Sequence, residues 1–179
     1  MTSSLGGRQH VVNPEDAAAP RWSGDGAAFT RLLMRTFPLE RRLSAAGEAL
    51  AQLAGQSLAR WMVLEAIDPG PATVADLGRT MGQARQGVQR LADLLVEDGL
   101  AAYQDNPRHA RAKLLTITPA GREVLRVIQN AQRGWADRIG RRLGAEPLEQ
   151  AGAVLDAVLA AVAEDMPSER KPSRGTAGG

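Results

Sequence analysis

The amino-acid sequence predicts a mainly α-helical protein with one small β-hairpin. Apolar residues recur at helical spacing through most of the chain, and several of these segments end at glycine. Two short segments with alternating apolar residues flank a polar tip, which is the pattern of a hairpin. With 179 residues, of which 44% are hydrophobic, the chain is long enough to bury a core in one domain with tails. Only 3% of the residues are aromatic, so aliphatic side chains must supply most of that core.

The composition excludes several kinds of site. Cysteine is absent, which removes disulfides, thiolate metal sites and cysteine nucleophiles and favours a reduced, cytoplasmic setting. His10 and His109 are too few for a histidine metal site, so we expect no metal and no cofactor. No stretch approaches the ~20 apolar residues of a membrane span, and residues 1–20 lack the apolar core of a secretion signal. No nucleophile elbow or phosphate-binding glycine loop is present, so we do not expect an enzyme.

Basic residues are concentrated in the middle of the chain, although the formal net charge is only +2. Arginines occur between Asp76 and Asp93, and again between Asp105 and Glu123, and neither interval contains an acid. Two acid-free basic intervals are a candidate surface for a polyanion such as nucleic acid. Two ordinary solvent-exposed surfaces are the alternative, and charge by itself does not choose between them.

The first half of the chain predicts two helices after a tail. Residues 1–23 and 166–179 are rich in Gly, Ser, Pro and Ala, and we expect both to be disordered. Residues 25–53 have mostly helical spacing, but Pro38 inside them predicts a kink or two helical pieces. A second helix is predicted from Gln56 to Ile67, where an Asp-Pro-Gly-Pro segment stops it.

The next elements are a short helix and a longer amphipathic one. Thr73 with an acid three residues later predicts a helix start, and Gly82 ends this helix after about two turns. Residues 84–98 form the best-defined helix, with an apolar face opposite Gln86, Gln89, Arg90 and Asp93. Gly99 fits the left-handed position that follows many helices.

A hairpin and two further helices complete the predicted order. Strands are expected at residues 100–104 and 113–118, and Thr118-Pro119 begins a helix that ends at Gly144. The last helix is predicted from Pro147 to Asp165. Its apolar stripe is wide for a surface helix, which favours burial against a partner over ordinary core packing.

A short helix, a glycine turn and a helix with an Arg/Gln-rich outer face are the parts of a helix-turn-helix. Gln can form paired hydrogen bonds with adenine, and Arg can do so with guanine, in the DNA major groove. Arg85, near the helix start, is suited to a phosphate contact. A solubilising surface is the alternative for this helix alone. The arginine-containing hairpin tip, which suits a minor groove, favours a winged helix-turn-helix.

The chain resembles the multiple antibiotic resistance regulator (MarR) family over about residues 29–162. The likeness is carried by QSLARWMVLEAI with GPATVADLGRTMG, by QARQGVQRLADLLVEDGL and by NPRHARAKLLTITPAGREVL. The resemblance implies a dimer with interlocked first and last helices, a recognition helix at residues 83–95 and a wing at residues 106–112. It also implies that a wing arginine reaches the minor groove, with Arg111 the best placed and Arg108 the alternative. Ala84 in place of a capping residue, Ala110 in place of a wing arginine, and Pro38 depart from the family pattern.

The resulting prediction is a MarR-like domain at residues 24–165. Its winged core spans about 56–118, and its dimerisation helices span about 25–53 and 119–165. The candidate DNA-binding residues lie on the two helices and the hairpin: Thr73, Arg79, Gln83, Arg85, Gln86, Gln89, Arg90, Arg108, His109, Arg111 and Lys113.

The predicted function is that of a homodimeric, sequence-specific regulator of transcription that binds double-stranded DNA at an inverted-repeat operator. By resemblance it is a repressor released by a small aromatic or phenolic effector. Arg60, Trp61 and Met62 are the candidate effector residues, with plain core packing as the alternative for Trp61. The alternative functions are a protein-interaction module and a non-specific architectural DNA binder.

Overall fold

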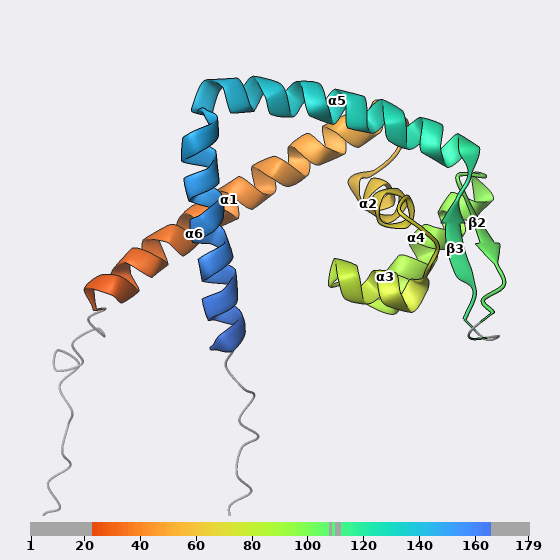
Figure 1. Cartoon of the computed structure of the whole chain (residues 1–179), viewed down its shortest axis with the longest axis horizontal. Coiled ribbons are helices and arrows are strands. Elements are labelled where there is room, and N and C mark those ends of the chain that lie inside the picture. Colours follow the sequence, from red (N-terminus) through yellow and green to blue (C-terminus); the bar gives the residue numbers. More distant parts are fainter. Residues whose placement is uncertain (1–22, 108, 110–111, 166–179) are drawn as a thin grey trace, which may run out of the picture. The chain divides into compact units, whose positions relative to one another are not determined.

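The computed structural model describes residues 23–107, 109 and 112–165 (Figure 1). The predicted tails therefore lie outside the described residues, apart from Ser23. In chain order the elements are α1 (Gly24–Gln52), α2 (Leu58–Ile67), β1 (Ala72–Thr73), α3 (Val74–Met81), α4 (Arg85–Glu97), β2 (Ala101–Gln104), β3 (Leu114–Ile117), α5 (Pro119–Leu143) and α6 (Ala145–Glu164). The chain divides into two units between Glu48 and Ala49, and each unit is described by itself.

The first unit contains most of α1, which is one uninterrupted helix through Pro38. The prediction of two helical pieces is therefore wrong. Proline removes one backbone hydrogen bond, but the long helical segments on both sides retain theirs and keep the helix continuous. The large apolar side chains of this part are exposed: Phe29, Leu33, Met34, Phe37, Leu39 and Leu43.

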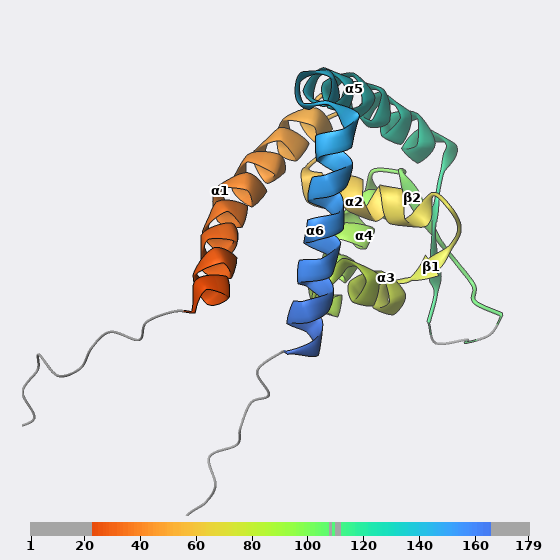
Figure 2. The same ribbon diagram turned by 60° about the vertical axis from the view of Figure 1, so that its left-hand side comes forward.

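The second unit is built around a small winged core. Its sheet has the order β1-β3-β2, and both pairings are antiparallel, with Tyr103 opposite Leu115. β1 was not predicted because two residues are too short to show an alternating pattern. Figure 2 shows that it leads directly into α3.

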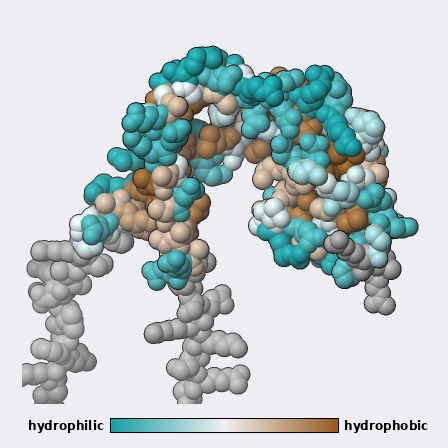
Figure 3. All heavy atoms as spheres, in the orientation of Figure 1, coloured by the Kyte–Doolittle hydropathy of each residue, from teal (hydrophilic) through white to brown (hydrophobic). Residues whose placement is uncertain are grey.

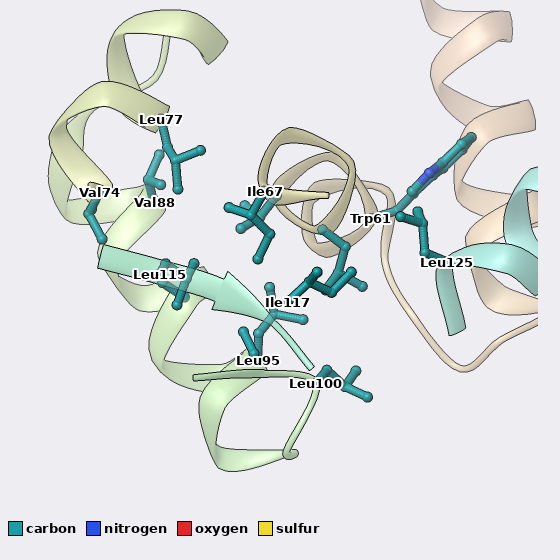
Figure 4. Packing of buried hydrophobic residues seen from close by; sticks show 14 of the residues in the cluster. Trp61, Ile67, Val74, Leu77, Val88, Leu95, Leu100, Leu115, Ile117 and Leu125 are labelled. Atoms are coloured by element: carbon teal, nitrogen blue, oxygen red, sulfur yellow. The ribbon is translucent and has the colours of Figure 1, made fainter. Parts of the chain in front are cut away.

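The core of this unit is aliphatic, as the composition predicts. Leu115 and Ile117 of β3 are buried, which confirms their inward alternation. Figure 4 shows them beside Ile67 of α2 and Val88 and Leu95 of α4. Because the buried face of α4 is held against both α2 and the sheet, its opposite face is left to solvent.

The turn between α3 and α4 is set by two glycines. Gly82 has the left-handed φ of 61°, and its N–H is hydrogen-bonded to the carbonyl oxygens of Gly78 and Arg79. Gly78 is buried, and a Cβ atom there would lie 3.1 Å from the carbonyl oxygen of Gln83. The absence of this Cβ lets the turn close directly onto α3, which fixes the angle at which α4 leaves.

The start of α5 is tied to the turn that follows α4. The hydroxyl of Thr118 donates to the carbonyl oxygen of Gly99 (2.7 Å) and accepts the N–H of Gly121 (3.1 Å). The Thr118 N–H also donates to the Leu100 carbonyl oxygen (3.1 Å). Gly99 has a φ of 72°, as its predicted left-handed position requires. One threonine thus joins α4, β2 and α5.

The last helix, α6, starts two residues before the predicted Pro147. Proline is tolerated there because the first-turn N–H groups of a helix have no partner within the helix. No residue of α6 is buried, and Figure 3 shows apolar, brown to tan surface along it. None of the helices in the described part of the chain is both long and apolar enough to cross a membrane.

A triangle of hydrogen bonds joins α4 to β2. The Tyr103 hydroxyl donates to Asp93 Oδ1 (2.8 Å), while Gln89 Nε2 donates to the same Asp93 oxygen (2.9 Å) and to the Tyr103 oxygen (2.7 Å). Partial burial and the hydrogen bond to Asp93 raise the pKa of Tyr103 to about 12. The helix with the Arg/Gln face is thereby held to the first strand of the wing.

Replacing Gly121 with alanine is expected to destabilise the protein by about 1–3 kcal/mol, because the added Cβ would overlap the Leu100 carbonyl oxygen and lie 2.8 Å from Ile117 Cγ1. Gly140→Ala in the same helix is the matched control, since a Cβ there meets nothing within 4 Å. That substitution should add about 0.5–1 kcal/mol through helix propensity. Urea unfolding measures both. If Gly121→Ala were as stable as the parent, Gly121 could not pack this closely against Leu100 and Ile117.

Tyr103 is the only tyrosine, so its ionisation can be followed by the near-ultraviolet absorbance of tyrosinate. The Tyr103 hydroxyl of the folded protein should titrate near pH 12, whereas the ordinary pKa of a tyrosine is 10.0. Because the folded pKa is raised, this contact stabilises the protein fully below pH 10 and the effect is lost as the pH rises towards 12. Asp93→Ala should lower the midpoint towards 10, and Asp156→Ala should leave it unchanged. A parent midpoint near 10 would mean that the Tyr103–Asp93 bond is not formed.

Candidate nucleic-acid interface

The outer face of α4 carries the basic and amide side chains that the sequence predicts. Arg85, Gln86 and Arg90 are exposed, and no described residue forms a hydrogen bond or ion pair with their side chains. They line a shallow hollow of about 600 Å³, the outer hollow, which is completed by Gln89, Asp93, Leu94 and Glu97. The acids of this surface lie at its C-terminal end, so the first two turns of α4 present only basic and neutral polar groups.

The N-terminus of α4 has no side-chain cap. Ala84 occupies the N-cap position and forms no side-chain hydrogen bond, which confirms the predicted loss of the usual cap. Backbone N–H groups in the first turn of a helix without a cap remain free to bind an anion, and the helix dipole favours negative charge there. Arg85 and Gln86 stand at this end, and Gln83 is exposed in the turn before it.

A second hollow of about 420 Å³, the wing hollow, lies between the starts of α3 and α4 and the wing. Its lining is Thr73, Val74, Ala75, Arg85, Gln89, Tyr103, Ala112 and Lys113. Arg85 and Gln89 therefore border both hollows. The two cations Arg85 and Lys113 come from different elements, so the fold brings together charges that are 28 positions apart in the sequence.

Two of the predicted DNA-binding residues already have partners at the start of α3. Thr73 caps the helix: its oxygen accepts the Asp76 N–H (3.1 Å), and its hydroxyl donates to Asp76 Oδ2 (2.6 Å). Asp76 also forms an ion pair with Arg79. The hydrogen bond from Thr73, followed by the charge of Arg79, lowers the pKa of Asp76. A phosphate that approached Arg79 would compete with an ionised carboxylate.

The described part of the wing is polar at its tip. The His109 N–H donates to the Asn106 carbonyl oxygen (3.2 Å), and the Ala112 N–H donates to the His109 carbonyl oxygen (2.9 Å). His109 and Lys113 are exposed. Arg108 and Arg111, the two wing arginines predicted to contact DNA, lie outside the described residues.

Tyr103 was not predicted to be part of this surface, and Asp93, which the sequence places on the polar face of α4, was not predicted as a partner of Gln89. They hold the half-buried Gln89, so the three residues form one unit, whereas Gln86 on the same helix has no such partners. Asp93 follows Gln89 by one helical turn, which is a signal visible in the sequence. The contribution of Tyr103 is not visible there, because it depends on how β2 packs against α4.

The fold separates Arg60 from the other two predicted effector residues. Trp61 is only 8% exposed, which places it in the core, whereas Met62 is 42% exposed. Arg60 points to the end of α4, where it forms an ion pair with Asp98. Trp61 and Met62 line a hollow of about 330 Å³, the α2 hollow, together with Leu58, Glu65, Ala66 and Gln132. Arg60 is not part of that lining, because its side chain serves the α2–α4 contact.

Glu65 is the charged residue of the α2 hollow, and it was not among the predicted effector residues. It accepts hydrogen bonds from Trp61 Nε1 (3.1 Å) and from Gln129 Nε2 of α5 (3.2 and 3.3 Å). Its spacing of one helical turn from Trp61 was the available signal. No cluster of metal-ligating side chains occurs within residues 23–107, 109 and 112–165.

Comparison with known sequences identifies relatives of this chain. A family model described as "MarR family" matches residues 54–112, the segment from before α2 to the wing. An uncharacterized protein of Mycobacterium tuberculosis is 40% identical over 100 residues, which is 56% of this chain and 70% of that protein. The transcriptional activatory protein BadR of Rhodopseudomonas palustris is 30% identical over 102 residues, 55% of this chain and 58% of that protein.

Solved structures share the fold at lower identity. A MarR family transcription regulator aligns with a TM-score of 0.69 and 23% identity over 79% of this chain and 96% of its own. Staphylococcus aureus MarR, in complex with salicylate and kanamycin, aligns with a TM-score of 0.66 and 16% identity over 78% and 97%. The M. tuberculosis regulator MosR, in complex with DNA, aligns with a TM-score of 0.57 and 22% identity over 72% and 96%.

The sequence and structural comparisons agree with the helix-turn-helix and wing described above. The family match covers the elements that carry Arg85, Gln86 and Arg90, and the fold matches extend to the helices on both sides. This chain therefore belongs to the MarR family, whose members are DNA-binding regulators of transcription and not enzymes.

Proposed function

We propose that this protein binds an inverted-repeat operator as a homodimer and represses transcription until a small ligand releases it. The observation that carries the DNA-binding part is the outer face of α4. Arg85, Gln86 and Arg90 are exposed there and have no side-chain partner among the described residues, while the other face of the helix is fixed in the core. A helix held in this way can enter a major groove with its base-reading side chains in a defined orientation.

Phosphate contacts are assigned to the groups around that helix. The N-terminus of α4, Arg85 and Lys113 offer positive potential on one surface, and Gln83, Thr73 and His109 offer polar contacts beside it. Arg79 would exchange its ion pair with Asp76 for a phosphate. Minor-groove contacts by Arg108 and Arg111 remain part of the proposal as the family resemblance implies them.

A homodimer is supported by the apolar surface of α6 and α1. No residue of the 20-residue helix α6 is buried, and Leu159 is 68% exposed. α1 also exposes Phe29 and Phe37. Apolar surfaces of this extent on a single chain are typical of protein interfaces. Two winged cores joined in this way would contact half-sites about one helical turn apart.

The α2 hollow is the proposed effector site, and its chemistry limits the effector. Its apolar lining suits an aromatic ring, but its charged group is the Glu65 carboxylate, and Arg60 is engaged elsewhere. Like charges repel, so a phenolic acid such as the salicylate bound by the S. aureus protein should be disfavoured. We therefore propose a neutral or cationic aromatic effector.

We propose that the protein represses transcription and does so because the bound dimer covers promoter DNA. The R. palustris relative is, by contrast, named as a transcriptional activatory protein. Transcription in vitro from a promoter that contains the selected operator decides the sign, and an increase on adding the protein would contradict repression.

The experiment that tests the proposed function is selection of random duplex DNA by the purified protein at physiological salt, followed by sequencing of the bound pool. An inverted repeat with half-sites about one turn apart is expected. Leu159→Asp on α6 should break the dimer, as sedimentation would show, and the selected pool should then lose its two-fold symmetry. Equal binding of all sequences would indicate an architectural DNA binder, and absence of binding would indicate a protein-interaction module.

Arg90→Ala should weaken operator binding by about 1–3 kcal/mol, or about 5–150-fold in Kd, and relax the base preference at one position of each half-site. Arg141→Ala at the end of α5 is the matched control and should leave the preference intact. Fluorescence anisotropy on cognate and scrambled duplexes measures both variants. Parent-like binding by Arg90→Ala on both duplexes would contradict the assignment of this residue.

Glu65→Gln should change which aromatic ligands bind. The parent is expected to bind benzamidine, a cation, more tightly than salicylate, and the variant should reverse or abolish that order because the repulsive carboxylate is gone. Calorimetric titration measures both ligands, with Glu97→Gln as the control. Stronger binding of salicylate than of benzamidine by the parent would contradict the proposed effector class.

A further inference from the structure

The side-chain amide nitrogen of Gln89 donates to two acceptors within the protein. Nε2 lies 2.9 Å from Asp93 Oδ1 and 2.7 Å from the Tyr103 oxygen. An amide nitrogen carries two hydrogens, and when each acceptor takes one of them no donor is left over.

The orientation of this amide is dictated by its partners. A carboxylate only accepts hydrogen bonds, so the Gln89 atom beside Asp93 must be the nitrogen and not the oxygen. The Tyr103 hydroxyl donates its one hydrogen to Asp93 (2.8 Å), so it can only accept a hydrogen bond from Gln89. Oε1 is the remaining polar atom of the amide.

Oε1 of Gln89 is the atom of this amide that has no partner among the described residues. It is not among the buried side-chain atoms that lack a partner, and no described residue donates a hydrogen bond to it. Gln89 borders both the outer hollow and the wing hollow, beside Arg85. The recognition surface thus presents a fixed acceptor with no accompanying donor at this position.

We propose that Gln89 reads DNA as a single hydrogen-bond acceptor and selects adenine or cytosine at one position of the half-site, with Tyr103 and Asp93 as its positioning residues. This inference rests on the proposed binding of α4 in the major groove. Adenine and cytosine present amino donors there, whereas guanine and thymine present acceptors that would repel Oε1. The paired bonds by which glutamine usually selects adenine alone need an amide donor that Gln89 no longer has.

Gln86 is the internal comparison. Its side chain is exposed and has no hydrogen bond to a described residue, so its amide retains a donor and an acceptor. It can form the paired contact with adenine. Two glutamines on one helix are therefore expected to have different base preferences, because only one of them is held by the fold.

The test is selection of random duplex DNA by the parent and by Gln89→Ala, Gln86→Ala and Tyr103→Phe, with each bound pool sequenced. The half-site position that loses its preference in Gln89→Ala should accept adenine and cytosine within about threefold in the parent. Tyr103→Phe removes one acceptor and frees an amide hydrogen for the purine ring, so adenine should gain over cytosine at that same position by about fivefold. A Tyr103 with only a structural role would weaken all positions alike.

Three results would overturn the inference: an adenine-only preference of the parent at that position, a Gln89→Ala pool identical to that of the parent, or an unchanged adenine-to-cytosine ratio in Tyr103→Phe. Failure of the proposed function is a separate result, because the parent would then select no motif at any position. Gln86→Ala controls for the loss of any glutamine and should affect a different position.

Discussion

The junction at which β3 passes into α5 determines the geometry of the winged core. Thr118 begins the helix, bonds the carbonyl groups of both Gly99 and Leu100, and accepts the N–H of Gly121. Gly121 lacks the Cβ that would collide with Leu100. This close approach holds the end of α4, the start of β2 and the first turn of α5 together. The wing and the outer face of α4 have defined positions because their bases meet there.

Charge on this surface is controlled by which arginines have partners. Arg60 and Arg79 form ion pairs with Asp98 and Asp76, so part of their charge is already compensated. Arg85 and Arg90 form no ion pair within the described residues. The Arg79–Asp76 pair is exposed and contributes little to stability, so its main effect is on where a polyanion finds uncompensated charge.

The polar side chains of α4 differ in the same way. Gln86 is free to adapt to a ligand, whereas Gln89 is fixed by Tyr103 and Asp93 before any ligand arrives. A fixed side chain loses little conformational entropy on binding, but it accepts fewer ligands. One hydroxyl group on the neighbouring strand therefore changes what an amide on the recognition helix can recognise.

Local chemistry determined much of this protein from the sequence alone. Thr73, Thr118, Gly82 and Gly99 fixed helix ends because caps and left-handed turns depend on neighbouring residues, and apolar spacing identified the buried faces of α4 and β3. The tertiary structure decided the rest: the strand β1, the continuous α1, the pairing of Gln89 with Tyr103 14 positions away, of Arg60 with Asp98 38 positions away, and of Glu65 with Gln129 64 positions away. Such pairs depend on how whole helices and strands pack, and no local sequence pattern shows which residues that are far apart in the chain will meet.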